Sequence, residues 1–270
     1  SEFTPAESGV KINKEILESM IKAGVENLGF TKDQKIIINP SFETIKPKIQ
    51  TSDVNNMGIK ELIGHGKSKF AGSIPSRIHN IILATSKING SLIAPGETFS
   101  FVNTIGDISK FTGYQEAYVI KDGKTILGDG GGVCQVSTTL FRAALSAGLP
   151  IVDRTAHAYR VGYYEQDSGP GFDATVYSPT IDLKIKNDTQ NYILIQASVN
   201  TSVPSLVFDL YGTKDSRVVN ITKPVILNQI PPPNDLYTDD PTIPCGVVKQ
   251  IEHKAWGSNV IFDFTITKVD

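Results

Sequence analysis

The stretch Gly128-Asp129-Gly130-Gly131-Gly132-Val133-Cys134-Gln135 decides how this sequence is interpreted. Glycine loses more conformational freedom on folding than any other residue, so a run of glycines is typical of a sharp turn or of backbone that another group approaches closely. Apolar residues follow at helical spacing: Val136, Leu140, Ala144 and Ala147. Gly148 stands where such a helix would end. We therefore predict a helix over residues 134–147 with Cys134 in its first turn.

A thiol at the start of a helix ionises more readily than a free cysteine, because the unpaired N–H groups and the helix dipole favour an anion. A neighbouring imidazole is the usual base that turns such a thiol into a nucleophile. A helix of about 14 residues rises about 21 Å, and a strand returning from Ile151 covers that length in about six or seven residues. This return brings His157 level with Cys134. The alternative is that Cys134 has only a structural role, as a small apolar residue buried at the start of the helix.

Asp173 is the candidate for the third group of a triad, which would orient the imidazole. A hairpin that turns at Glu165 pairs residues equally distant from the turn, and so places Asp173 opposite His157. A turn centred near Ser168 would instead place Asp173 opposite a residue near Gly162, and the triad would not form. The sequence leaves both registers open, and Asp173 could also merely cap a turn.

The composition excludes several classes of protein. Of 270 residues, 40% are hydrophobic and 20% are charged, which is typical of a globular chain and not of low-complexity disorder. The 26 basic and 28 acidic residues give a net charge of -2, so no overall positive charge favours nucleic acid. No apolar run approaches the roughly 18 residues of a membrane span. Two cysteines, Cys134 and Cys245, are too few for a disulfide scaffold.

The rest of the chain divides into three expected parts. Residues 1–45 form an N-terminal segment with a helix near 13–28 and a strand near 35–38, and residues 46–215 form the main domain. Residues 216–270 form a β-rich C-terminal extension.

Within the main domain we expect a short helical turn at 60–63, a turn at Gly64-His65-Gly66 and a helix from Ser76 to Asn89-Gly90. Strands are expected at Tyr192–Ala197 and Leu206–Tyr211 in this domain, and at Val260–Lys268 in the C-terminal extension.

Four separated motifs carry a resemblance to a known family. They are Arg77-Ile78-His79-Asn80-Ile81, Pro95-Gly96-Glu97-Thr98-Phe99-Ser100-Phe101, Gly130 through Thr139, and Asp173-Ala174-Thr175-Val176. In this order they resemble the VanW family, over residues 46–215. The resemblance implies a bacterial cell-surface protein, because the family, named after a vancomycin-resistance gene cluster, often occurs beside modules thought to bind peptidoglycan.

A more distant resemblance is to the transglutaminase-like branch of the papain-type fold. There too a cysteine opens a helix that ends in a Gly-Leu/Ile-Pro turn like Gly148-Leu149-Pro150, with a histidine on the next strand and an aspartate on the one after. The fold class implied is α+β, with the cysteine-bearing helix packed on an antiparallel sheet. The sequence departs from that pattern because no tryptophan precedes the cysteine, which leaves the oxyanion donor unassigned.

These observations support two function hypotheses. The first is a cell-envelope enzyme in which Cys134, His157 and Asp173 catalyse amide hydrolysis or transpeptidation on peptidoglycan peptides or a surface protein. The second is a non-catalytic module that binds a cell-wall polymer. Six residues are expected to contact the substrate or polymer: Gly131, Gly132, Gln135, Arg77, Arg154 and Tyr159.

No cofactor is expected, and the net charge gives no reason to expect nucleic acid as a partner. No metal site is expected either, since His65, His79 and His253 lack zinc-ligand spacing. The glycine loop could alternatively bind an anion, although it matches neither the phosphate-loop nor the dinucleotide pattern. The chain begins Ser1-Glu2-Phe3 without methionine. The family resemblance implies an extracellular or cell-surface protein of a bacterium, and from this start of the chain we expect that a signal or anchor has been removed.

Overall fold

The computed structural model describes residues 7–26, 37–47, 56–121, 124–250, 254 and 256–268. The chain divides into two compact units, Ser1–Met57 and Gly58–Asp270. The second unit holds every residue for which the sequence predicts a role in binding or chemistry.

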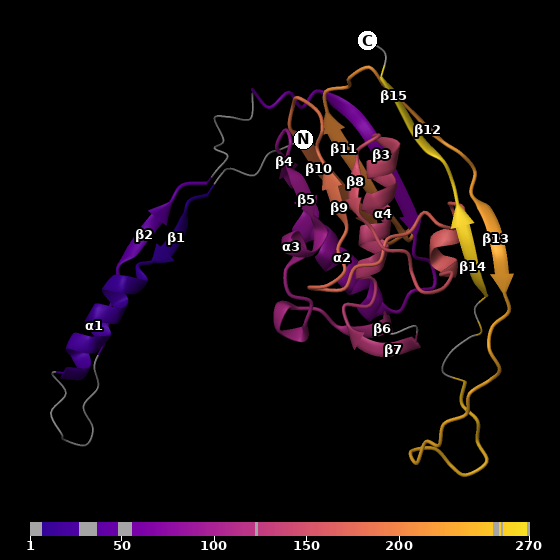
Figure 1. Cartoon of the computed structure of the whole chain (residues 1–270). Coiled ribbons are helices and arrows are strands. Elements are labelled where there is room, and N and C mark those ends of the chain that lie inside the picture. The colour runs from indigo at the N-terminus through magenta and orange to yellow at the C-terminus, as the bar shows by residue number, and fades with distance from the viewer. Residues whose placement is uncertain are drawn as a thin grey trace. The chain divides into compact units, whose positions relative to one another are not determined.

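The first unit contains two paired strands, and a helix connects them in the sequence (Figure 1). Its elements are β1 (Gly9–Ile12), α1 (Lys14–Glu26) and β2 (Phe42–Ile45), and the strands are antiparallel. The side-chain oxygen of Asn13 accepts the backbone N–H of Ile16 at 3.1 Å, which caps the start of α1. The helix expected near residues 13–28 is thus confirmed.

The strand expected near residues 35–38 is not observed. Residues 35 and 36 lie outside the described residues, and residues 37 and 38 form no strand. The strand that pairs with β1 is β2, which lies further along the chain.

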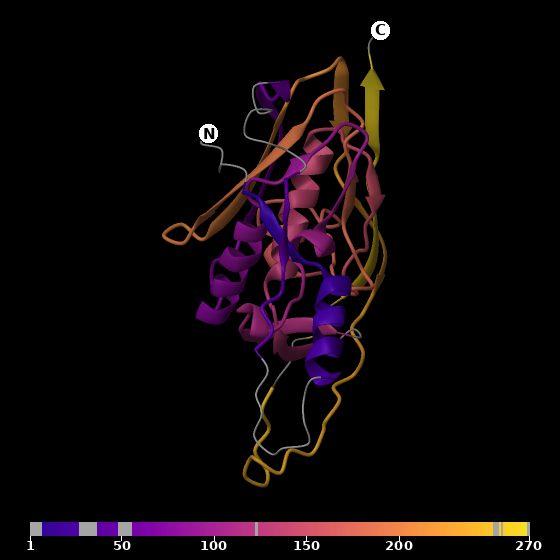
Figure 2. The same ribbon diagram turned by 90° about the vertical axis from the view of Figure 1, so that its left-hand side faces the viewer.

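The second unit is built on a four-stranded antiparallel sheet with the strand order β3-β11-β10-β4. These strands are β3 (Glu61–Lys69), β4 (Leu92–Ile93), β10 (Ile193–Asn200) and β11 (Ser205–Gly212). Helix α4 (Val133–Ser146) packs against β3 and β11, and α2 (Pro75–Ile88) packs against β10 and α4. Figure 2 shows the two helices side by side. The architecture is therefore mixed α and β, with mostly antiparallel sheets.

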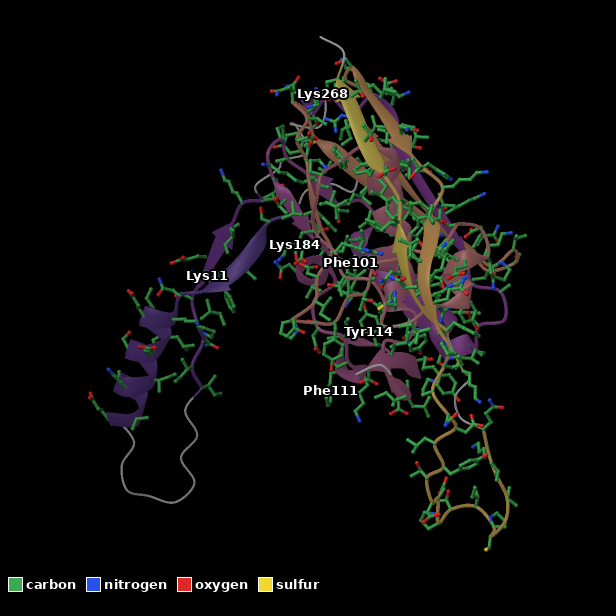
Figure 3. All side chains as sticks on the ribbon, turned by 45° about the vertical axis from the view of Figure 1, so that its right-hand side comes forward. Lys11, Phe101, Phe111, Tyr114, Lys184 and Lys268 are labelled. Atoms are coloured by element: carbon green, nitrogen blue, oxygen red, sulfur yellow. The ribbon has the colours of Figure 1, made fainter. Side chains whose placement is uncertain are left out.

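Shorter elements surround these helices. They are β5 (Thr98–Ser100), α3 (Phe101–Ile105), η2 (Lys110–Thr112), β6 (Glu116–Lys121), β7 (Lys124–Asp129), β8 (Ile151–Asp153), η3 (Gly162–Glu165) and β9 (Lys184–Lys186). Strands β5, β9 and β8 form a small sheet, and β6 and β7 form a hairpin. Phe101 and Tyr114 are buried in this part of the unit, whereas Phe111 is 89% exposed (Figure 3).

The prediction of a helical turn at 60–63 and a turn at Gly64-His65-Gly66 was wrong. Lys60 directly precedes β3, and residues 61–66 belong to this strand. The glycines serve close packing there. A Cβ added at Gly64 would lie 2.6 Å from the Cβ of Ala147, and one added at Gly66 would lie 2.3 Å from the carbonyl oxygen of Thr139. Glycine on one face of β3 therefore lets α4 lie directly against the strand backbone.

The C-terminal extension is β-rich, as expected. It contains β12 (Arg217–Ile221), β13 (Val225–Ile230), β14 (Gly257–Ile261) and β15 (Phe264–Lys268), drawn in orange to yellow in Figure 1. Strand β12 pairs with β15 and β13 pairs with β14. The single strand expected over Val260–Lys268 is divided at Phe262 and Asp263: β14 pairs with β13, β15 pairs with β12, and Phe262 between them packs against Phe172 with ring centroids 4.4 Å apart.

We predict that Gly66→Ala lowers the free energy of unfolding by about 1–3 kcal/mol, because the added methyl group meets helix backbone that cannot rotate away. Chemical denaturation monitored by circular dichroism measures the change. The control is Gly162→Ala, whose methyl group meets nothing within 4 Å and should change stability by less than about 0.5 kcal/mol. Equal stability of the two variants would contradict the packing described for β3 and α4.

Candidate active site

Cys134 is the second residue of α4 and is partly exposed to solvent. The backbone turns sharply into the helix through Gly130 (φ +84) and Gly132 (φ +110), which are conformations that other residues rarely adopt. The sulfur of Cys134 lies 3.5 Å from the carbonyl oxygen of Val176. The predicted helix and the place of the thiol in its first turn are both confirmed.

The glycine run also fits tightly against neighbouring backbone. A Cβ added at Gly131 would lie 2.6 Å from the carbonyl oxygen of Tyr118, and one at Gly132 would lie 2.9 Å from that of Arg77. The buried amide of Asn80 donates to the Gly131 carbonyl at 3.0 Å. The sequence suggested Gly131 and Gly132 as substrate contacts. Close packing of their loop between α2 and β6 is a structural reason for glycine at both positions.

The segment that carries Asp173 is fastened to α4. The hydroxyl of Ser137 donates to the Ala174 carbonyl at 2.7 Å, and the Ala174 N–H donates to the hydroxyl of Thr138 at 3.0 Å. These polar residues of α4 are completely buried, so the two hydrogen bonds fix the segment firmly against the helix. The same segment brings Val176 next to the thiol.

His157 lies opposite Asp173, in the first of the two registers that the sequence left open. Strand β8, which pairs with β9, ends at Asp153, earlier than expected, and an isolated antiparallel bridge then joins Thr155 to Thr175. The Nδ1 atom of His157 lies 2.6 Å from Oδ2 of Asp173, and the backbone N–H of His157 donates to the same oxygen at 2.9 Å. One carboxylate oxygen thus holds both the ring and the backbone of the histidine.

Arg154 holds the same carboxylate from another side. Its guanidinium donates to Oδ1 of Asp173 at 3.1 Å, to the Asp173 carbonyl at 2.7 Å and to the Gly171 carbonyl at 2.8 Å. The Arg154 side chain therefore joins the chain directly after β8 to the Gly171–Asp173 backbone. Arg154, which the sequence suggested as a substrate contact, therefore orients Asp173.

The ionisation of the thiol and the imidazole is coupled. Burial raises the pKa of Cys134, but the hydrogen bond and the charge of His157 outweigh burial and hold that pKa below its usual value. Burial lowers the pKa of His157, but hydrogen bonds to Asp173 and Cys134 outweigh it and raise the pKa to about 9. For Asp173, burial raises the pKa, and the hydrogen bonds from His157 bring it below its ordinary value. The thiolate form of Cys134 and the imidazolium form of His157 therefore stabilise each other.

Two residues that the sequence analysis missed complete the surroundings. Tyr164, which is 6% exposed, packs on the His157 ring at a centroid distance of 5.0 Å. Arg142 donates from within α4 to the carbonyls of Lys67, Tyr164 and Phe172. It therefore ties β3 and both sides of the 164–172 loop to the helix. The one available signal in the sequence was that Arg142 is the only charged residue of α4.

The other expected contact residues are divided between the interior and a cavity. Gln135 is completely buried, and its amide bonds to Arg77, Ser68 and the Lys69 carbonyl. Tyr159 and Arg154 line a cavity of about 140 Å³ that also touches His157 and Asp173. Cys134 is not among the lining residues, so this cavity lies against the imidazole–carboxylate pair and not over the sulfur. Its far wall comes from Ser258, Val260 and Phe262 of the C-terminal extension.

Among the residues that the structure describes, no group of three or more His, Cys, Asp or Glu side chains is arranged to hold a metal ion. Within the same described ranges, no helix combines the length and the apolar character needed to cross a bilayer.

Comparison with known protein families assigns a family to this chain. A family model described as "VanW like protein" matches residues 76–211, which are 136 of the 270 residues. The chain belongs to the VanW family. The matched range includes Cys134, His157 and Asp173, and the family resemblance of the sequence is thereby confirmed.

Two bacterial relatives of this VanW-family chain have related sequences. "Uncharacterized protein YoaR" of Bacillus subtilis (strain 168) is 36% identical over 181 residues, which cover 66% of this chain and 57% of YoaR. "Vancomycin B-type resistance protein VanW" of Enterococcus faecalis (strain ATCC 700802 / V583) is 38% identical over 115 residues, which cover 42% of each protein. The chain thus spans less than two thirds of either relative. No solved structure matches the chain significantly, so no neighbour supports the papain-like core that the sequence suggested.

We predict that Asp173→Asn lowers the pKa of His157 from about 9, since the carboxylate is what holds the proton on the ring. A loss of about one to three pKa units is the usual effect of removing an opposite charge at this range. An NMR titration of the imidazole signals of the 4 histidines measures the shift.

The control for this titration is Asp209→Asn, which removes the carboxylate beside the exposed His65. It should leave the His157 signal unchanged. A His157 that titrates alike in the wild type and in Asp173→Asn would rule out the coupling described for this pair.

Proposed function

We propose that this VanW-family protein is a cysteine-dependent acyl-transfer enzyme of the bacterial cell envelope that acts on an amide of peptidoglycan peptides or of a surface protein. The observation that carries the proposal is the hydrogen-bonded pair of His157 and Asp173, whose imidazole is electrostatically coupled to the thiol of Cys134. Nucleophile, base and orienting carboxylate in this sequence are the requirements for covalent acyl transfer. The envelope location is supported by the bacterial relatives, one of which is named as a vancomycin-resistance protein.

In the first half of the proposed reaction, the thiolate of Cys134 attacks the amide carbonyl carbon and forms a C–S bond. The imidazolium of His157 gives its proton to the leaving nitrogen as the C–N bond breaks, which leaves a thioester on Cys134 and a neutral imidazole. In the second half, His157 takes a proton from water or from an amine, whose oxygen or nitrogen attacks the thioester carbon. Expulsion of the sulfur restores the thiolate. Hydrolysis and transfer share this thioester and differ only in the second nucleophile.

The start of α4 is suited to hold the negative charge that develops on the carbonyl oxygen. The N–H groups of Val133 and Gln135 donate to the carbonyls of Gly130 and Gly132. The N–H of Cys134 lies between them in the first turn, where no intrahelical acceptor exists. We assign this N–H as the oxyanion donor, which fills the role that the missing tryptophan left open.

We predict that iodoacetamide near pH 6 alkylates Cys134 at least about ten times faster than Cys245, because the thiolate is the reacting form and the charge of His157 favours the thiolate of Cys134. His157→Ala should remove most of this advantage. Peptide mass spectrometry after timed quenching measures both sites in the same molecule, so Cys245, which is free and exposed, is an internal control. Equally slow labelling of the two cysteines would favour the non-catalytic wall-binding module.

The substrate part of the proposal has its own test. Purified peptidoglycan fragments incubated with the protein should acylate Cys134 or show a broken or exchanged amide bond, as intact-mass and fragment analysis would detect. Cys134→Ala should abolish the reaction, and Cys245→Ser should leave it unchanged. Turnover that persists in Cys134→Ala would show that another group performs it.

A further inference from the structure

The arginines of the chain differ in their ionic partners. There are five, and four of them form ion pairs with a carboxylate: Arg142 with Asp167, Arg154 with Asp173, Arg160 with Glu165, and Arg217 with Asp215 and Asp188. Among the described residues, no Asp or Glu lies within ion-pair distance of Arg77. Arg77 is therefore the one arginine whose charge the described part of the chain does not neutralise.

Arg77 is nevertheless held in a fixed position. Its guanidinium donates to the hydroxyl of Ser73 at 2.7 Å and to Oε1 of Gln135 at 2.7 Å, and it lies over the ring of Tyr163 at 4.6 Å from the centroid. Gln135 is itself completely buried and bonded to Ser68. A chain of neutral groups thus fixes the cation, and none of them supplies a negative charge.

The position of Arg77 is beside the thiol. Gln135, which binds the guanidinium, directly follows Cys134, and the carbonyl oxygen of Arg77 lies against Gly132 at the start of α4. The charge of Arg77 is close enough to act on the ionisation of Cys134, in the same direction as His157.

A guanidinium that is held in place and has no carboxylate partner among the described residues is suited to bind an anion from solution. Arginine has five N–H donors, and the described hydrogen bonds of Arg77 use two of the nitrogen atoms, NH1 and NH2, once each. The remaining donors match the two oxygens of a carboxylate. The start of α4 favours negative charge at the same place.

We propose that Arg77 binds a carboxylate of the substrate, so that the acyl compound attacked by Cys134 carries a negative charge next to its reacting carbonyl. This inference rests on the proposed acyl-transfer function and narrows its substrate to acidic peptides or acidic amides. Arg77 is then a specificity-determining residue.

A pair of thiol reagents tests this assignment without knowledge of the natural substrate. Iodoacetate and iodoacetamide react in the same way, since the sulfur displaces iodide and forms a C–S bond, but only iodoacetate carries a carboxylate. The ratio of their rates at one cysteine cancels any change in the amount of thiolate, because both reagents need the thiolate equally. What remains is the recognition of the carboxylate.

We expect the iodoacetate-to-iodoacetamide ratio at Cys134 to exceed that at Cys245, and to fall about fivefold in Arg77→Gln, as for a unit charge at close range. Arg77→Lys keeps the charge and should retain part of the ratio. Added salt should weaken the preference in the wild type. The control is Arg217→Gln, which also removes one positive charge but donates to the Gly148 carbonyl at the opposite end of α4. It should leave the ratio at Cys134 unchanged.

The outcomes separate this inference from the function on which it rests. If Cys134 reacts rapidly with iodoacetamide but Arg77→Gln and Arg77→Lys leave the ratio at the wild-type value, the carboxylate site is refuted and the activated thiol stands. A ratio at Cys134 no greater than that at Cys245 in the wild type overturns it as well, without any variant. If Cys134 is unreactive toward both reagents, the acyl-transfer proposal fails and the carboxylate site fails with it.

Discussion

The Asp173 carboxylate is the point on which the arrangement of the site depends. One of its oxygens holds the ring and the backbone of His157, and the other accepts the guanidinium of Arg154. Regular pairing ends at Asp153, so the chain around His157 has little strand structure to fix it. The carboxylate replaces that structure, and it also keeps the proton on the imidazole that stabilises the thiolate.

A second constraint brings the thiol to the same place. Helix α4 lies against β3 because Gly64 and Gly66 present no side chain to it, and the opposite side of the helix is fastened to Ala174 by the hydroxyls of Ser137 and Thr138. The helix is therefore held between a strand and the segment that carries Asp173. Cys134 at the helix start and Asp173 in this segment are placed by the same contacts, which is why a thiol 23 positions before His157 in the sequence is electrostatically coupled to its imidazole.

Much of the fold and of the candidate site could be predicted from local sequence. The glycine run, the apolar spacing that follows it and Gly148 together locate α4 and place Cys134 in its first turn, because each of these signals acts within a few residues. The pairing of His157 with Asp173 could be narrowed only to two registers, since the position of the turn between them is set by Arg142 and by bonds of Arg154 to the Gly171–Asp173 backbone. Those contacts join residues distant in sequence and leave no periodic pattern.

Other features were missed for the same physical reason. Gly64-His65-Gly66 is locally typical of a turn, and only the presence of a helix on one face of β3 makes glycine suitable for a strand. Ser258, Val260 and Phe262, which line the cavity beside His157, lie more than a hundred residues after it in the sequence. The unpaired charge of Arg77 is likewise visible only when the partners of all five arginines are known.

At neutral pH Cys134 should be a thiolate that the imidazolium of His157 stabilises. The most direct test is an NMR titration of the protein labelled with ¹³C at the cysteine Cβ, in which Cys245 is the internal reference. The account predicts that the Cβ shift of Cys134 is already that of a thiolate at pH 7 and changes to the thiol value only in more acidic solution, while His157→Ala restores a neutral thiol at pH 7. A Cys134 signal that stays at the thiol value up to pH 8 in the wild type would contradict it.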